Sequence, residues 1–201
     1  MAWHFDTAMR VARDALKHIR NCPVKYASGF SGIDIFATAL DHATHGKWSH
    51  MFASEHNKKL RRALELTYSA NGLCTPHIYD DIECDGILHE PTAHIYVLTP
   101  PCGAFSSQNR KPQRLVQAKE LAKIRVAMQY VTRNTPKVVI IENVANQAVM
   151  TPISAEVART KSIGYTWTRT MICPHEHLQC AVKRPRSIWM GVLTRKKEVA
   201  G

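Results

Sequence analysis

The sequence predicts an α/β fold in which a doubly wound, mostly parallel sheet is closed by an antiparallel hairpin. Strand-like and helix-like segments alternate along the chain with no internal repeat and no low-complexity linker. In addition, 137–142 is an almost continuous apolar run of β-branched residues, which is typical of a parallel strand buried on both faces. The 201 residues, of which 45% are hydrophobic, fit a single domain over 1–201.

The helices and strands of the N-terminal half are predicted from the spacing of apolar residues and from helix-breaking residues. Residues 5–20 carry apolar side chains at helical spacing and precede the breaker Asn21-Cys-Pro23, so 1–22 is expected to form a helix that packs on the core. The next apolar segments are expected to form a short strand and then a helix that begins around Ile33. The remaining elements of this half are a strand at 48–54, a basic-faced helix at 57–70 and a short strand at 78–79.

The C-terminal half contains the strongest patterns. A strand at 93–98 ends before Pro100 and Pro101, because proline fixes φ and removes the backbone donor that a central strand needs. The longest helix is expected at 114–133, where apolar residues recur at helical spacing and lysines and arginines lie between them. After the strand at 137–142, the expected elements are a helix at 152–162 and a hairpin of 165–172 with 186–194.

Charge favours a polyanionic partner. The chain has 27 Lys and Arg against 16 Asp and Glu, a net charge of +11 that is spread along its length. A basic surface that binds nothing specific is the alternative, because net charge also governs solubility. No run approaches the roughly 20 apolar residues of a membrane span, and the N-terminus lacks a signal-peptide pattern, so we expect a soluble intracellular protein of the cytoplasm or nucleus.

The six cysteines form no Cys-x-x-Cys pair and are too sparse for a disulfide scaffold, so reduced thiols are expected. One cluster offers four side chains that zinc could use, at Cys173, His175, His177 and Cys180. These four residues crowd one short loop, and no second ligand pair lies elsewhere to complete a tetrahedral site. We therefore predict no metal, with zinc at this loop as the open alternative.

Cys102 is the first candidate catalytic residue. It follows Pro100-Pro101 on a rigid turn directly after an apolar strand, which places its thiol at the strand's carboxyl end, where open α/β sheets bind ligands. A cysteine in this position is a candidate nucleophile. The alternative is a buried cysteine that acts as a small hydrophobic residue.

Three more polar elements fall at strand ends on the same side of the predicted sheet. The turn Phe30-Ser-Gly-Ile-Asp34 leads into a helix, whose positive end can hold an anionic group. Glu55 ends the second strand, in a position to accept hydrogen bonds from ribose hydroxyls. Glu142 ends the buried fifth strand, where desolvation would raise its pKa toward that of a general acid. Taken alone, such an element more often serves only a turn or a cap.

Together, from about residue 26 to 192, these segments resemble the cytosine-C5 DNA methyltransferase family. Its catalytic core is a Rossmann-like domain that uses S-adenosylmethionine. The resemblance implies that the cofactor binds at Phe30, Ser31, Gly32 and Ile33, at Glu55 with its ribose, at Asp81 and Ile82 with its adenine, and at Pro100. It implies that Cys102, Glu142 and Arg184 are catalytic. Ser106, Arg110, Lys111, Arg114 and Arg186 are the expected nucleic-acid contacts. For Arg110, Lys111 and Arg114, the alternative is a solvated basic turn.

The chemistry of this family accounts for the residue types. The resemblance implies that the Cys102 thiolate adds to C6 of cytosine while Glu142 binds N3, and that C5 of the resulting enamine takes the methyl group. Arg184 would neutralise charge that develops near the base. Because C6 is inaccessible in a stacked duplex, the base must be flipped out, which costs a few kcal/mol and is offset by basic contacts to the strand.

The sequence also departs from the family pattern. Asp34 stands where the family usually has a second glycine, Gly103 follows the nucleophile in place of the commoner glutamine, and Val182 stands where the late arginine motif usually begins with glutamine. The family's target-recognition domain is missing, so we expect low sequence selectivity or a recognition subunit or neighbouring domain. The alternatives are the same reaction on RNA, and a degenerate module that binds cofactor or nucleic acid without turnover.

Overall fold

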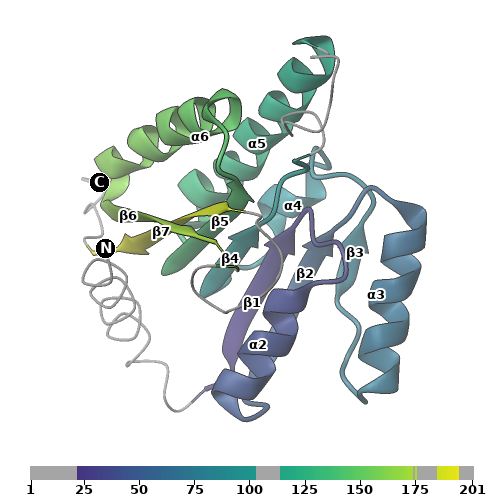
Figure 1. The fold of residues 1–201 in the computed structure, drawn as a ribbon. Coiled ribbons are helices and arrows are strands. Elements are labelled where there is room, and N and C mark those ends of the chain that lie inside the picture. Colours follow the sequence, from purple (N-terminus) through teal and green to yellow (C-terminus); the bar gives the residue numbers. More distant parts are fainter. Residues whose placement is uncertain (1–21, 103–113, 174, 176–184, 195–201) are drawn as a thin grey trace.

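A computed structural model of the protein describes residues 22–102, 114–173, 175 and 185–194. Its sheet contains seven strands in the order β3-β2-β1-β4-β5-β7-β6 (Figure 1). The strands are β1 (Val24–Gly29), β2 (Trp48–Ser54), β3 (His77–Tyr79), β4 (Ile95–Leu98), β5 (Val138–Val144), β6 (Tyr165–Ile172) and β7 (Arg186–Leu193). The helices are α2 (Ile35–Thr44), α3 (Lys58–Ala70), α4 (Gly86–His89), α5 (Arg114–Asn134), α6 (Gln147–Thr160) and the short 3-10 helix η3 (Lys161–Ile163).

The sheet is parallel except at one end. Strands β3, β2, β1, β4 and β5 pair in parallel, whereas β7 is antiparallel to both β5 and β6. The chain builds outward from β1 to β3 and then returns to β4 on the other side of β1, which creates a topological switch point between β1 and β4. The predicted doubly wound sheet with a closing antiparallel pair is therefore confirmed.

Helices cover both faces of the sheet. Figure 1 shows α2 and α3 on one side, where Ala37, Leu64 and Tyr68 pack on the strands. The opposite side is covered by α4, α5 and α6, and its core is larger. Strand β5 contributes side chains to both cores, as its continuous apolar run predicted, because helices exclude water from each face of a doubly wound sheet.

The largest differences between the predicted and observed elements concern two helices. The predicted helix start at 152 was wrong, because α6 already begins at Gln147 and carries Pro152 in its interior. The side chain of Asn146 caps this end by accepting the Ala148 N–H at 2.9 Å. The single-turn helix α4 was not predicted, since four residues are too few to show helical spacing. The expected helix at 5–20 lies outside the described residues.

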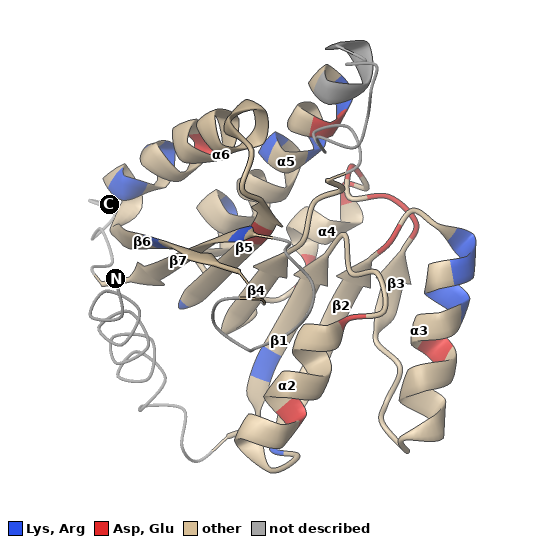
Figure 2. Ribbon diagram, in the orientation of Figure 1, with Lys and Arg blue, Asp and Glu red and all other residues tan. Residues whose placement is uncertain are grey.

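No helix in the described part of the chain is long and apolar enough to cross a membrane. Acidic residues lie in the loops after β2 and β3, whereas lysines and arginines lie on α3, α5 and α6 (Figure 2). The acidic loops stand at the carboxyl edge of the parallel strands. This edge is where the candidate site residues gather.

Candidate functional site

The strand register brings the predicted site residues to one edge of the sheet. Gly29 of β1 is paired with Leu98 of β4, and Leu98 is paired with Ile141 of β5. The residues that follow Gly29, Leu98 and Ile141 therefore lie side by side at the carboxyl edge. They are the glycine-containing turn, the cysteine loop and Glu142. The prediction that Glu142 ends its strand was wrong, because β5 continues through Glu142 to Val144, where it pairs with β7.

The loop that carries Cys102 is held from both sides. Thr99 donates its hydroxyl to the Phe30 carbonyl at 2.8 Å, and on the other side Asn143 donates its amide to the Pro100 carbonyl at 3.0 Å. Asn143 is only 1% exposed, so this hydrogen bond is shielded from water. The Cys102 thiol is half-buried and forms no disulfide. The sequence analysis assigned no role to Asn143, although its position directly after Glu142 was an available signal.

Glu142 lies beside an arginine from the last strand. The Arg186 Nε is 2.7 Å from Glu142 Oε1, and the two side chains are 20% and 24% exposed. This is a charge-assisted hydrogen bond that fixes the orientation of the carboxylate. Arg186 is also a predicted nucleic-acid contact, and in the structure its guanidinium is paired with Glu142. Desolvation of Glu142 was expected from the sequence, whereas the neighbouring Arg186 cation was not predicted. Arg184 lies outside the described residues.

The turn after β1 is hydrogen-bonded to Glu55, the acidic residue that follows β2. The Gly32 N–H donates to Glu55 Oε2 at 2.8 Å, and the Asn57 N–H donates to Oε1 at 2.7 Å. Gly32 has a φ of +58°, a conformation that glycine adopts without strain. Ser31 is buried, and its N–H donates to the Ser54 carbonyl at 2.8 Å, which joins the turn to β2.

A cavity of about 380 Å³ opens between this turn and α5. Its volume falls in the range of about 300–1,000 Å³ that is typical of small-molecule sites. Five of the predicted cofactor residues line it, while Ser31, Ile33 and Pro100 do not. Its lining residues are Phe30, Gly32, Ser54, Glu55, His56, Leu60, Asp81, Ile82, Thr99, Pro101, Glu120 and Lys123. Sequence reasoning missed the two residues from α5, because nothing in a charged helical face shows which side chains turn toward a cavity.

Asp81 is held in this cavity by three neighbours. It accepts the Glu83 N–H at 3.1 Å, and its Oδ2 lies 3.8 Å from Lys123 Nζ and 3.9 Å from His56 Nδ1. The carboxylate is about one-third exposed, so it remains accessible to a ligand.

The sequence model of the C-5 cytosine-specific DNA methylase family matches residues 24–199. The chain belongs to this family.

Solved structures share the fold of this chain. Dnmt2 methyltransferase of S. pombe is 18% identical with a TM-score of 0.60, over 88% of this chain and 51% of that one. Methyltransferase EhMeth of Entamoeba histolytica is 14% identical with a TM-score of 0.60, over 86% and 54%. NSun6 of Pyrococcus horikoshii, solved with SFG, is 13% identical with a TM-score of 0.64, over 94% and 52%. The chain thus spans about half the length of these structures. No curated protein sequence matches it.

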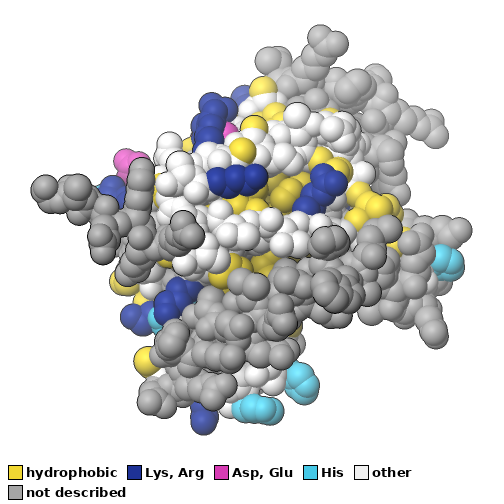
Figure 3. Space-filling view, turned by 90° about the vertical axis from the view of Figure 1, so that its left-hand side faces the viewer, with side chains coloured by type: hydrophobic (Ala, Val, Ile, Leu, Met, Phe, Trp, Pro, Cys, Tyr) yellow, Lys and Arg dark blue, Asp and Glu magenta, His cyan; other side chains and the backbone are white. Residues whose placement is uncertain are grey.

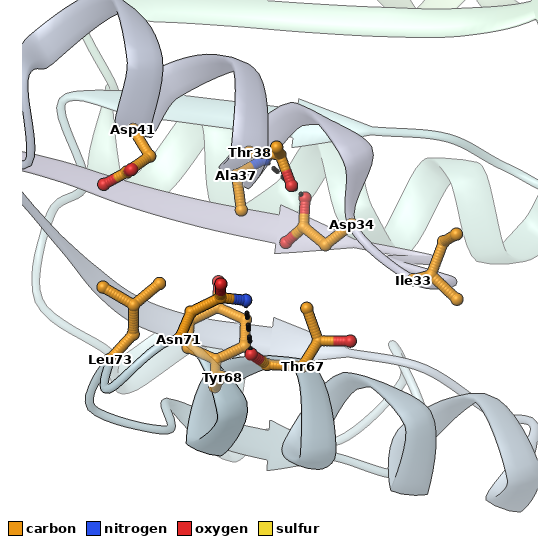
Figure 4. Close-up of a pocket in the computed structure, with 9 residues that line it drawn as sticks. All are labelled: Ile33, Asp34, Ala37, Thr38, Asp41, Thr67, Tyr68, Asn71 and Leu73. Carbon is orange, nitrogen blue, oxygen red and sulfur yellow. Dashed lines mark hydrogen bonds between the residues drawn. The ribbon is translucent and has the colours of Figure 1, made fainter.

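Asp34, which replaces the second glycine expected in the family, has its own structural role in this chain. It has a φ of 52° and caps α2, and its carboxylate accepts from the Tyr26 hydroxyl at 2.6 Å, the Ser28 hydroxyl at 2.8 Å and the Ala37 N–H at 3.2 Å. Burial raises the pKa of Asp34. The carboxylate lies at a separate hollow between α2 and α3 (Figure 4), which Ile33 also lines, so it does not occupy the cavity that contains Gly32.

A buried histidine extends this polar network. His50 Nδ1 is hydrogen-bonded to the Tyr68 hydroxyl, and His50 Nε2 lies 3.2 Å from the Ser28 hydroxyl, which in turn donates to Asp34. Burial lowers the pKa of His50 to about 3, so the ring is neutral near pH 7. The 3.8 Å between Nε2 and the Asp34 carboxylate is too long for a hydrogen bond, and Ser28 bridges the two groups.

The described residues contain no group of three or more His, Cys, Asp or Glu side chains arranged to hold a metal ion. Of the four candidate zinc ligands, Cys173 is buried and His175 is exposed. His177 and Cys180 lie outside the described residues. Zinc binding at this loop is therefore untested by the structure.

Proposed function

We propose that this chain is the catalytic core of a cytosine-C5 DNA methyltransferase that transfers a methyl group from S-adenosylmethionine to C5 of cytosine. Methyltransferases of this family use S-adenosylmethionine in general. The observation that carries the proposal is the buried hydrogen bond from Asn143 to Pro100, which ties the cysteine loop to the strand that bears Glu142. A nucleophile and an acid are thereby held at one edge, next to a cavity large enough for a cofactor.

The cavity residues fit the cofactor's parts. Each oxygen of Glu55 accepts one backbone N–H and keeps a lone pair with which it can accept a ribose hydroxyl. Asp81 offers an accessible acceptor to the adenine amine, and Ile82 offers an apolar surface. Phe30 and Gly32 form the wall next to the cysteine loop, where a reactive methyl group would have to lie. When bound, the cofactor supplies an electrophilic methyl group.

The chain's own residues would activate the base. The Cys102 thiolate adds to C6 of the flipped cytosine, while Glu142 holds the N3 edge and supports its protonation, which leaves C5 as an enamine carbon able to attack the methyl group. Loss of the C5 proton and departure of the thiolate then restore the aromatic ring. Arg186 holds Glu142 in position through this sequence. Arg184, by the family resemblance, neutralises charge near the base.

The nucleic-acid partner is part of the proposal. Ser106, Arg110, Lys111, Arg114 and Arg186 are the expected contacts. Ser106, Arg110 and Lys111 lie outside the described residues, and Arg114 begins α5. The net charge of +11 favours a polyanion. Because the chain spans about half the length of the solved structures that it resembles, we propose that selective reading of DNA depends on a recognition subunit or a neighbouring domain.

The test is methyl transfer from labelled S-adenosylmethionine to matched DNA and RNA pools, followed by analysis of the product nucleosides. We expect 5-methylcytosine in DNA and a covalent adduct with DNA that contains 5-fluorocytosine, since fluorine cannot leave C5 as a proton does. Cys102→Ser should abolish both while keeping the fold and DNA affinity, because loss of a covalent step acts on the transition state. Cys84→Ser, which changes an exposed thiol outside the cavity, should behave as wild type.

Two results would contradict the proposal. An active wild type that forms no adduct, together with an active Cys102→Ser variant, would remove Cys102 from the mechanism. Methylation of RNA in the absence of DNA methylation would replace DNA by RNA as the substrate class.

A further inference from the structure

Three carboxylates line the cofactor cavity, and two of them have partners. Glu55 is bonded to two backbone N–H groups, and Asp81 is bonded to the Glu83 N–H and faces the Lys123 ammonium at 3.8 Å. The third is Glu120 on α5, one helical turn before Lys123. Its Oε2 is buried and has no hydrogen-bond partner within the described part of the chain.

A buried carboxylate oxygen without a donor is unfavourable, because it has lost hydration and gained nothing in return. Such an atom in the wall of a cavity favours a ligand that brings a hydrogen-bond donor or a positive charge. The charges of the described lining residues also favour a ligand with a positive charge. They include the three carboxylates against one lysine ammonium, and the single histidine, His56, has a side chain 79% exposed to water.

The two ligands of this cavity under the proposed function differ in charge. S-adenosylmethionine carries a sulfonium, an ammonium and a carboxylate, which gives a net charge of +1. Its demethylated product, S-adenosylhomocysteine, has a neutral thioether and a net charge of zero. An excess of negative charge in a partly desolvated cavity therefore stabilises the substrate form more than the product form.

We propose that Glu120 is a specificity-determining residue that makes the cavity prefer the sulfonium cofactor over its neutral product, and that this preference limits inhibition by the product. The inference rests on the proposed function, because it takes the cavity to be the S-adenosylmethionine site. Glu120 acts through its charge rather than through covalent chemistry. Its charge therefore strengthens binding of the cationic cofactor and leaves binding of the neutral product nearly unchanged.

The size of the effect follows from Coulomb's law. Two unit charges about 12 Å apart at an effective dielectric of about 20 change a binding constant about tenfold, and a closer approach increases the factor. Salt in the buffer reduces it. We therefore expect the ratio of the two dissociation constants to change by about tenfold when the Glu120 charge is removed in low-salt buffer.

The experiment is calorimetric titration of the full chain with S-adenosylmethionine and with S-adenosylhomocysteine. Glu120→Gln keeps the shape of the side chain and should weaken S-adenosylmethionine about tenfold while leaving S-adenosylhomocysteine unchanged. The matched control is Glu83→Gln, which removes an acid near Asp81 that is exposed and does not line the cavity. It should change neither affinity. Lys123→Met makes the cavity more negative and should shift the ratio in the opposite direction to Glu120→Gln.

The outcomes separate this inference from the proposed function. Equal weakening of both ligands by Glu120→Gln, or no weakening of either, would overturn the role of Glu120 while the wild type still binds cofactor. Should Glu120→Gln fail to fold, an unchanged ratio in Lys123→Met would overturn the charge argument. A wild type that binds neither ligand, with DNA present, would overturn the proposed function and this inference with it.

Discussion

The buried His50 is expected to make the protein lose stability in mild acid. Its pKa is lowered from 6.5 to about 3 by burial, so the unfolded chain binds a proton in a pH range where the folded protein does not. The stabilising contribution is present above pH 6.5 and is lost as the pH falls toward 3. Between pH 7 and pH 4 the loss is about 3 kcal/mol, from about 1.36 kcal/mol for each pH unit below 6.5.

Asp34 acts in the opposite direction over the same range. Its pKa is raised by burial, so its contribution is present below its ordinary value of 3.8 and is lost as the pH rises through the raised value. Wild-type stability therefore reports the sum of both groups and of the other carboxylates. Comparison with a variant that lacks only the histidine isolates the His50 contribution.

Urea unfolding at pH 7, 6, 5 and 4 measures this contribution in the wild type and in His50→Gln. The variant should be less stable at pH 7, because its contacts with Tyr68 and Ser28 change, but it should lose about 3 kcal/mol less than the wild type between pH 7 and pH 4. His56→Gln, which changes an exposed histidine, should follow the wild-type pH dependence. Equal losses in the wild type and His50→Gln would refute the linkage argument.

Two further substitutions test packing and the cysteine loop. Gly191→Ala should destabilise the fold by about 1–3 kcal/mol in urea unfolding, because a Cβ there would stand 2.6 Å from the Trp167 ring; an unchanged midpoint would show that the indole moves freely. Asn143→Ala should cost about 1–3 kcal/mol by leaving the buried Pro100 carbonyl without its donor, and should slow single-turnover methyl transfer by loosening the loop of Cys102. A wild-type rate of methyl transfer in Asn143→Ala would show that the hydrogen bond from Asn143 to Pro100 does not position the Cys102 thiol.

The fold class could be predicted from the sequence because its signals are local. The apolar run of β5 and the long amphipathic α5 are each visible within about 20 residues, and their alternation with other segments favours a parallel sheet. The start of α6 could not be located from the sequence, because two signals conflict. Asn146 is a suitable N-cap, whereas Pro152 is typical of a first helical turn and suggests a later start. The alternation of strands and helices was also enough to predict that the site lies at the carboxyl ends of the strands.

The contacts within the site depend on packing between distant segments. Arg186 meets Glu142 because β7 runs antiparallel to β5 with Arg186 opposite Val144, and no spacing in the sequence reveals that register. Asp34 could be identified as an unusual residue at a glycine position. Its compensating partners could not, because Tyr26 and Ser28 lie on β1 and the histidine that extends the network lies on β2.

The insertion of β7 between β5 and β6 has a consequence for synthesis of the chain. In the described sheet β6 pairs with β7 alone, although the ribosome makes β6 first. A nascent chain that ends before Arg186 therefore has a completed cysteine loop and Glu142 but no partner strand for β6, whose exposed edge invites pairing with other chains. Docking of β7 pairs one edge of β6 and brings Arg186 to Glu142 in the same step, so the partner strand of β6 and the ion pair of the site form together.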